Sequence, residues 1–453
     1  MRYTEADLSL TPGPAPAGQQ KGITAMRLGL TEIILVLFII LVIFGPGIYN
    51  WASRYARRFR AQQAEEARRR AAWEAERRAR RDFILHRFQI AAAVFAVLMA
   101  AGLVYTLGFR PIDAQPQSYT LPAAQAPQGG QTAAETVSLP LEGYQSPDCM
   151  VRQDGWLYLA ARPLEGEGSA LLRMREDGTG LTVVLTEQGT ITSFAFDGEG
   201  DIWYTRLTRE GGALCQASHD DWGAATQQVV NQIDGRALSY PAAVAVDQEG
   251  RVYFTEAARQ GTRSGTLEDV LRAELIGHTA TGWVYVYDPA ARTVQRVLGG
   301  VAGASGLALS PEGDTLYVAD LASRCIWAVD SDSRELTAGG KGCTLFAGDL
   351  PGYPGALTTD EEGSVYAAYA WDQSDWLENR ADDPGFREVA ARLPRSVQQR
   401  LFRRCPTAAQ GFDPEGQLEA TYGSSDVTGW AAAASGNRLY LPGTDSNVCY
   451  FRF

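Results

Sequence analysis

The sequence predicts an all-β fold, a six-bladed β-propeller over residues 136–453, preceded by two transmembrane α-helices. Two observations predict the propeller. A polar turn that ends in glycine, followed closely by an aromatic residue in an apolar run, occurs six times, and the copies lie about 45 to 70 residues apart, a spacing typical of four-stranded blades. The helices are predicted from two apolar runs near the N-terminus. A β-sandwich with coincidental turns is the alternative for the β-rich part.

Each repeat has the pattern of a β-hairpin. Polar-Gly turns between alternating apolar strands are a strong hairpin signal, because glycine adopts the positive φ that such turns require. A short apolar strand precedes each turn, as in Val244–Val246 and Leu307–Leu309. The turn glycines are Gly155, Gly200, Gly250, Gly313, Gly363 and Gly436.

The sixth blade needs a strand from elsewhere in the chain. After the last turn only three strands fit before Phe453, whereas Glu135–Leu141 alternates like a strand. We expect this segment to complete the last blade and so close the ring, which removes a free sheet edge.

Cysteines follow the same period as the blades. We expect four of them in third strands, where Leu171 or Leu172 occupies the equivalent place in blade one, so this position is a buried apolar slot. The sequence does not decide whether Cys325 and Cys343 form a disulfide. The four cysteines are Cys215, Cys325, Cys405 and Cys449.

The N-terminal region contains two apolar runs, Leu28–Phe44 and Phe88–Phe109, that flank the arginine-rich segment 51–87. Positively charged loops stay in the cytoplasm, so segment 51–87 is expected inside and the propeller outside. Segment 111–135 is rich in Pro, Ala, Gln and Gly, which predicts a flexible stalk. The expected organisation is therefore a tail 1–27, a membrane helix 28–50, a basic cytoplasmic helix 51–87, a second membrane helix 88–109, a disordered stalk 110–135 and the propeller 136–453.

Composition excludes several function classes. The formal net charge is −12, and because residues 1–109 are basic, the remainder is strongly acidic, which argues against nucleic acid as a partner. The chain has only three histidines, and its six cysteines include no C-x-x-C pair. Multi-histidine metal centres and zinc ribbons are therefore not expected.

The first apolar run resembles the TatA subunit of the twin-arginine translocase. The resemblance covers about thirty residues, LGLTEIILVLFIILVIFGPGIYNWASRYARRF, with Glu32 near the helix start, the hinge Phe44-Gly45-Pro46 and a basic helix from Ile48. It implies a membrane anchor followed by a helix that binds anionic lipid. The start codon is either Met1 or Met26, since MRLGLTE is similar to a TatA start.

The β-rich part resembles the strictosidine synthase-like propellers, which are related to the gluconolactonase/regucalcin and paraoxonase propellers. The motifs are ASGLALSPEGDTLYVAD, FAGDLPGYPGALTTDEEGSVYAA, and VYFTEAARQ followed by Leu267–Leu275 and GWVYVYDP. Arg380–Arg404 resembles the insertion of blade five. The resemblance implies a six-bladed fold over nearly all of residues 136–453.

The functional residues of these families are mostly missing. The metal-dependent relatives hold a cation with carboxylates and Asn carbonyls. Here the matching positions are Asp148, Ala242-Ala243, Ser305 and Gly355-Ala356, and the glutamate of the strictosidine synthases is absent from Val427–Ala432. We therefore expect no metal and no cofactor. A Ca²⁺ ion bound by Asp148 is the one alternative kept.

The expected function is a ligand- or partner-binding platform anchored to membrane lipid. A polar and aromatic channel mouth suits an uncharged or cationic small organic ligand, and an envelope protein is the other partner considered. A lactonase or esterase-type hydrolase and an envelope or translocase-associated protein are the alternatives. The residues expected at the channel mouth are Asp148, Tyr240, Ser305, Asp320, Asp426 and Trp430.

Overall fold

The computed structural model describes residues 30–112, 115–223, 226–259 and 265–452. The chain divides into two compact units, Met1–Leu98 and Met99–Phe453, and each is described by itself.

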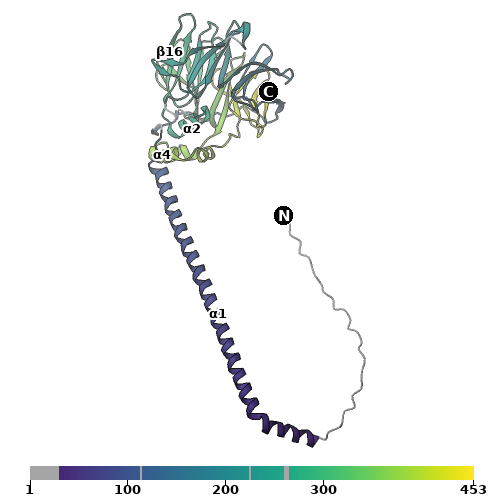
Figure 1. Ribbon diagram of the computed structural model, residues 1–453. Coiled ribbons are helices and arrows are strands. Elements are labelled where there is room, and N and C mark those ends of the chain that lie inside the picture. Colours follow the sequence, from purple (N-terminus) through teal and green to yellow (C-terminus); the bar gives the residue numbers. More distant parts are fainter. Residues whose placement is uncertain (1–29, 113–114, 224–225, 260–264, 453) are drawn as a thin grey trace, which may run out of the picture. The chain divides into compact units, whose positions relative to one another are not determined.

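The larger unit contains a six-bladed propeller whose blades are antiparallel sheets (Figure 1). Blades one to three are β3 (Cys149–Gln153), β4 (Trp156–Ala161), β5 (Ser169–Arg175) and β6 (Thr182–Glu187); β7 (Thr190–Phe196), β8 (Ile202–Leu207), β9 (Gly212–Ala217) and β10 (Thr226–Val230); and β13 (Pro241–Val246), β14 (Val252–Glu256), β15 (Gly282–Asp288) and β16 (Thr293–Val301). Blades four to six are β17 (Ala304–Leu309), β18 (Thr315–Asp320), β19 (Cys325–Asp330) and β21 (Cys343–Ala347); β22 (Gly352–Thr359), β23 (Val365–Asp372), β24 (Ala409–Phe412) and β25 (Leu418–Tyr422); and β26 (Ala433–Ser435), β27 (Arg438–Pro442), β28 (Asn447–Arg452) and β2 (Val137–Pro140).

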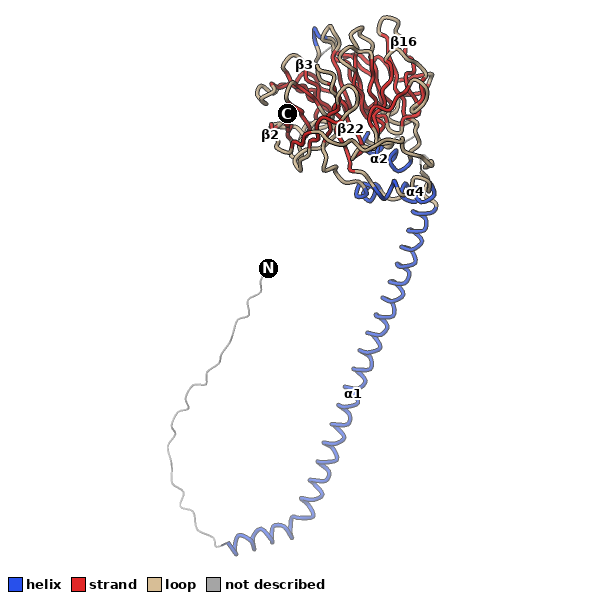
Figure 2. The backbone as a smooth tube through the Cα atoms, turned by 180° about the vertical axis from the view of Figure 1, so that it is seen from behind, coloured by secondary structure: helices blue, strands red, loops and turns tan. Residues whose placement is uncertain are grey.

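Smaller elements complete the blades and their connections. β20 (Leu336–Thr337) pairs in parallel with β16, and β11 (Gln232–Ile233) pairs with β12 (Arg236–Ala237). The helices are α2 (Leu267–Gly277), α3 (Asp375–Glu378), α4 (Pro384–Arg392) and α5 (Arg395–Gln398), with 3₁₀ turns at His219–Asp221 and Gln399–Leu401. In Figure 2, α2 and α4 lie at the same end of the propeller.

The six predicted glycine turns are confirmed. Each joins the first and second strands of a blade, and each glycine has a positive φ, for example 85° at Gly200 and 91° at Gly363. Acidic side chains before the glycine order the turn, because the Asp197 carboxylate accepts hydrogen bonds from the backbone N–H groups of Glu199 (3.0 Å) and Asp201 (2.9 Å). Local chemistry at the turns therefore fixes the repeat unit of the fold.

The predicted closing strand is confirmed as well. β2 pairs antiparallel with β28, from Val137 opposite Tyr450 to Pro140 opposite Asn447. A second N-terminal strand, β1 (Gln131–Ala133), adds in parallel to the outer edge of blade five. The chain before blade one therefore covers the outer edges of two blades, where unpaired backbone groups would otherwise face solvent.

Three of the four periodic cysteines lie where the sequence places them. Cys215, Cys325 and Cys449 are buried in β9, β19 and β28, the third strands of their blades. Cys405 is buried but precedes β24, because the long insertion of blade five ends only at this point. Each of the six cysteines is a free thiol, so the bridge between Cys325 and Cys343 is not formed.

Segment 111–135, which we expected to be a disordered stalk, instead packs on the propeller where it is described. The backbone N–H of Gln117 donates to Gly277 O (2.8 Å), and that of Tyr119 donates to Ala381 O (3.2 Å). The Tyr119 ring stacks on His278 with the centroids 3.7 Å apart. Composition misleads here because one aromatic ring and a few backbone hydrogen bonds hold a segment that has almost no other large apolar residue.

The N-terminal region also differs from the expectation of two membrane helices separated by a basic cytoplasmic helix. It forms one continuous helix, α1 (Leu30–Gly108), of 79 residues. The arginine-rich part contains strong helix formers and no internal glycine or proline, and Glu-to-Arg pairs four residues apart, such as Glu65–Arg69 at 2.8 Å, support it. Figure 1 shows α1 bending in its N-terminal part, which contains the helix-breaking Pro46.

One stretch of α1 is long and apolar enough to cross a membrane. It lies within Gly45–Gly108, whereas Thr31–Ile43 is apolar over too few residues. Large side chains of this stretch are exposed, for example Phe95 at 66 % and Val97 at 67 %. Exposed apolar surface of this extent suggests membrane association.

Candidate functional site

The first strands of the six blades begin at the same end of the propeller and surround a cavity of about 2270 Å³. Every blade contributes to its wall near the start of its first strand. These six residues are Asp148, Thr192, Ala242, Ser305, Gly355 and Thr428. The propeller therefore brings together the positions that the family resemblance marked as metal-ligand positions.

Two of these six residues, Thr192 and Thr428, were missed by sequence reasoning. A signal was available, because both lie eight residues before the turn glycine of their blade, as do Ala242, Ser305 and Gly355. Counting back eight residues from the turn glycine would have identified five of the six ring residues, whereas in blade one Asp148 lies seven residues before Gly155.

Four of the six predicted channel residues line this cavity: Asp148, Tyr240, Ser305 and Trp430. Asp426 does not line it; this residue is exposed, and its carboxylate accepts a hydrogen bond from Ser425 Oγ (2.9 Å). Asp320 does not line it either.

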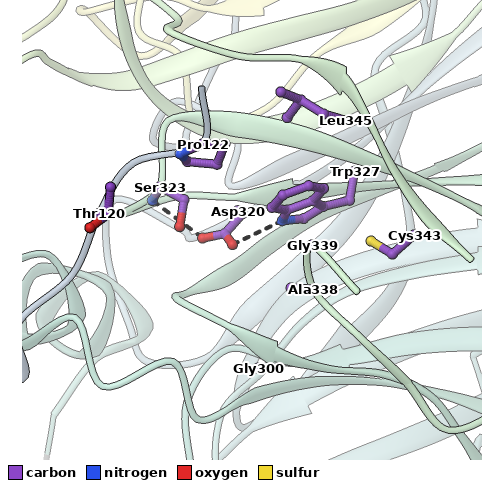
Figure 3. Close-up of a pocket in the computed structure, with 10 residues that line it drawn as sticks. All are labelled: Thr120, Pro122, Gly300, Asp320, Ser323, Trp327, Ala338, Gly339, Cys343 and Leu345. Carbon is purple, nitrogen blue, oxygen red and sulfur yellow. Dashed lines mark hydrogen bonds between the residues drawn. The ribbon is translucent and has the colours of Figure 1, made fainter. Parts of the chain in front are cut away.

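Asp320 lies instead at a separate cavity of about 470 Å³ beside blade four (Figure 3). Its carboxylate accepts hydrogen bonds from Trp327 Nε1 (3.0 Å), Ala302 N (3.1 Å) and Ser323 N (3.3 Å). Burial raises the pKa of Asp320 to about 6 although these donors favour the charged form. The three donors tie the end of strand β18 to strand β19 and to the two loops that contain Ala302 and Ser323, which is a structural role.

The hydroxyl groups of the ring are used in contacts between neighbouring blades. Thr192 Oγ1 donates to Pro241 O (2.9 Å), and Ser305 Oγ donates to Pro354 O (2.7 Å). Each bond joins the first strand of one blade to the first strand of the next. Because each hydroxyl has only one hydrogen to donate, these groups can offer a ligand only their oxygen lone pairs.

Asp148 is the only carboxylate of the ring, and it is paired. Arg162 Nε lies 3.2 Å from Asp148 Oδ2. Burial raises the pKa of Asp148, and Arg162 opposes this shift.

A hard cation such as Ca²⁺ needs six to eight oxygen ligands. Among the other five ring residues, Thr192 and Ser305 already donate their hydroxyl hydrogens to a neighbouring blade. Ala242 and Gly355 have no polar side-chain atom, and Thr428 has a single hydroxyl. Across the described ranges, no group of three or more His, Cys, Asp or Glu side chains is arranged to hold a metal ion.

The wall of the cavity carries two ion-pair clusters that sequence reasoning missed. In the first, Glu256 is fully buried and accepts from Ser239 N (3.0 Å) and from Arg236, while Arg259 Nε lies 3.4 Å away. Arg259 also stacks on Trp283, 4.7 Å from the ring centroid. The motif VYFTEAARQ contains Glu256 and Arg259, so a charged pair at the end of an apolar strand was the available signal.

The second cluster joins blade one, through Glu187 at the end of β6, to blade two, through Tyr204 and Arg206 of β8. Glu187 accepts from Tyr204 Oη (2.5 Å) and pairs with Arg206 (3.3 Å). Burial is the largest cause of the strong rise in the pKa of Tyr204, and Glu187 adds to it. In both clusters the carboxylates are matched by arginines within the protein. The cavity wall is therefore polar but charge-balanced, which favours an uncharged ligand over a bare ion.

Comparison with known proteins agrees with the architecture. Residues 207–376 match the SMP-30/Gluconolactonase/LRE-like region. The chain is similar to Strictosidine synthase-like 13 of Arabidopsis thaliana (23 % identity, 43 % of this chain and 47 % of that protein) and to the adipocyte plasma membrane-associated protein of Salmo salar (29 % identity, 30 % and 31 %). These matches span less than half the length of each relative.

Solved structures of similar fold include a gluconolactonase from Xanthomonas campestris, at 18 % identity and a TM-score of 0.47 over 72 % of this chain and 98 % of that one. A regucalcin from Agrobacterium tumefaciens matches at 13 % identity and a TM-score of 0.44, over 73 % and 95 %.

Proposed function

We propose that this chain is a membrane-anchored, extracytoplasmic propeller that binds an uncharged organic molecule in its central cavity. The observation that carries the proposal is the charge-balanced wall around a large cavity, in which Asp148, Glu187 and Glu256 are each paired with an arginine. Apolar surface for a ligand comes from Trp430, Tyr240 and the leucines of α2 and of neighbouring loops.

The proposal that the chain is anchored in a membrane rests on α1. The 22 residues from Phe88 to Phe109 contain no charge, and the arginine-rich part of α1 precedes them. Positively charged segments next to a span stay in the cytoplasm, which supports the proposal that the propeller lies on the other side. The TatA-like start of the chain supports an anchor by its shape, and no role in protein export is proposed for it.

The side of the membrane can be tested by labelling. Val183 is 51 % exposed on β6, so a Val183→Cys variant presents a thiol on the propeller surface. A membrane-impermeant maleimide added to intact cells should label it. Labelling only after the cells are opened would contradict an extracytoplasmic propeller.

The ligand can be tested by organic extraction of the purified full chain followed by mass spectrometry. A near-stoichiometric organic molecule is expected from the natural chain and from Trp156→Ala, a change at the opposite end of blade one. The Trp430→Ala variant should lose most of it, because Trp430 lines the cavity. Equal amounts from both variants would show that the molecule binds elsewhere.

Calcium separates this proposal from a metal-dependent lactonase or esterase. A cation that binds only the folded chain stabilises it by about 2.7 kcal/mol at a hundred times its dissociation constant, which raises the unfolding temperature by a few degrees. We expect no such shift on adding calcium and none on adding a chelator. A calcium-dependent shift that disappears in Asp148→Ala would place the hydrolase function first.

A further inference from the structure

The insertion of blade five concentrates positive charge in a part of the chain that is otherwise acidic. Between Pro384 and Arg404 the sequence has six arginines and a single acidic residue, Glu388. Arg400, Arg403 and Arg404 are exposed, and none of them forms an ion pair with a described residue. This cluster is therefore available to an anionic partner.

The same insertion exposes apolar side chains. Helix α4 buries Arg387 and Ala390 against the propeller but exposes Phe386 (40 %) and Val389 (37 %), which lie three residues apart and so share one face. Val397 of α5 is 39 % exposed. Apolar residues beside arginines on short surface helices are typical of segments that lie in a membrane interface.

The position of the insertion is fixed next to the point where the uncharged stretch of α1 ends. Arg110 is the first charged residue after Arg87. Its guanidinium donates to Arg392 O (3.1 Å), and Arg392 Nε donates to Arg110 O (3.0 Å). The C-terminus of α4 is thus held at Arg110 by two reciprocal hydrogen bonds. Wherever the stretch Phe88–Phe109 leaves a bilayer, α4 and α5 lie at that surface.

We propose that one exposed face of the insertion, made of Phe386 and Val389 of α4, Val397 of α5, and Arg400 and Arg403 after α5, is a second membrane contact that binds the anionic lipid surface at the exit of α1. This inference rests on the proposed anchoring by α1. Arg395 of α5 also lines the central cavity, so the contact places the cavity mouth beside the lipid headgroups.

The test uses the full chain in lipid nanodiscs with a fluorescent probe on a single introduced cysteine. Val389→Cys and Val397→Cys report on the proposed face, and Val183→Cys, also an exposed valine (51 %), is the matched control. Lipid carrying a quencher in its interfacial region should quench the probes at 389 and 397 and leave the probe at 183 unchanged. Quenching should be stronger in anionic than in zwitterionic lipid.

Replacing single arginines by glutamine tests the electrostatic contribution to the contact with anionic lipid. Arg400→Gln and Arg403→Gln should each lower the ratio of quenched to unquenched probe about fivefold, as expected for the loss of one interfacial arginine. Arg175→Gln, an exposed arginine at the opposite end of blade one, should not. Extraction of the chain by alkaline carbonate would overturn the anchor itself. A chain that resists extraction but shows the same quenching at 389, 397 and 183 would overturn only the second contact.

Discussion

Arg387 is expected to hold the segment before the propeller in place, and replacing it tests that arrangement most directly. Its side chain is fully buried, yet none of the carboxylates in the described part of the chain forms an ion pair with it. The guanidinium donates instead to backbone carbonyls of three separate regions: Gln117 O before the propeller, Ile276 O (3.0 Å) and Gly277 O (3.3 Å) at the end of α2, and Arg380 O (3.1 Å) and Ala381 O (3.2 Å) before α4. Arg387 also lies over the Tyr119 ring at 4.9 Å.

The Arg387→Met variant keeps most of the volume and removes every donor. Gly277 O, Arg380 O and Ala381 O retain backbone donors, whereas Gln117 O and Ile276 O lose the only donors that the structure gives them among the described residues. An unsatisfied buried carbonyl costs about 1–3 kcal/mol. Burial lowers the pKa of Arg387, so removing the charge offsets part of this loss. Gln117 is an exposed residue, so water can replace the donor to its carbonyl, and only the Ile276 carbonyl is left buried without a donor. We therefore expect the free energy of unfolding to fall by about 2 kcal/mol.

The assay combines urea unfolding of the full chain with limited proteolysis. In Arg387→Met, segment 115–125 should become a cleavage site under conditions where the propeller stays intact. Arg403→Met, a change of an exposed arginine in the same insertion, should alter stability by less than about 0.5 kcal/mol. If the two variants unfold alike and segment 115–125 stays protected in both, Arg387 does not hold that segment.

Two further outcomes follow from burial. Leu139→Asp places a charge at the buried position of β2 and should lower the urea midpoint strongly by opening blade six, while Val137→Asp, at an exposed position of the same strand, should leave it nearly unchanged. Burial raises the pKa of Glu274 from 4.5 to about 7, so the folded chain keeps this proton while the unfolded chain releases it; stability should therefore fall as the pH rises from about 4.5 to 7. Glu274→Gln should flatten this dependence in urea titrations, and an unchanged slope would mean that another group causes it.

The sequence alone determined the repeat unit and its number. Each turn glycine needs a positive φ that other residues adopt at a cost, and each is flanked by strands of alternating or apolar pattern, so blade hairpins can be located one by one. The closing strand Val137–Pro140 could be predicted because three strands after Gly436 leave a blade incomplete. These features depend on residues close together in the chain.

The candidate site could be predicted only in part. Asp148, Tyr240, Ser305 and Trp430 lie at the cavity because they are near the starts of first strands, a position that the repeat defines. Asp320 ends a second strand, where local bonds to Trp327 and Ser323 turn its carboxylate away from the channel.

Tertiary structure decided the pairing of charges and the fate of segment 111–135. Nothing in the sequence near Glu256 indicates that Arg236 would neutralise it, since the two belong to different elements of the propeller wall. Tyr119 lies in a segment that composition describes as flexible, yet its ring stacks on His278 and lies beside Arg387. Burial, aided by Arg387, lowers the pKa of His278 to about 3. Arg236 and Glu256 are 20 positions apart and Tyr119 and His278 are 159 apart, and only the folded chain brings each pair into contact.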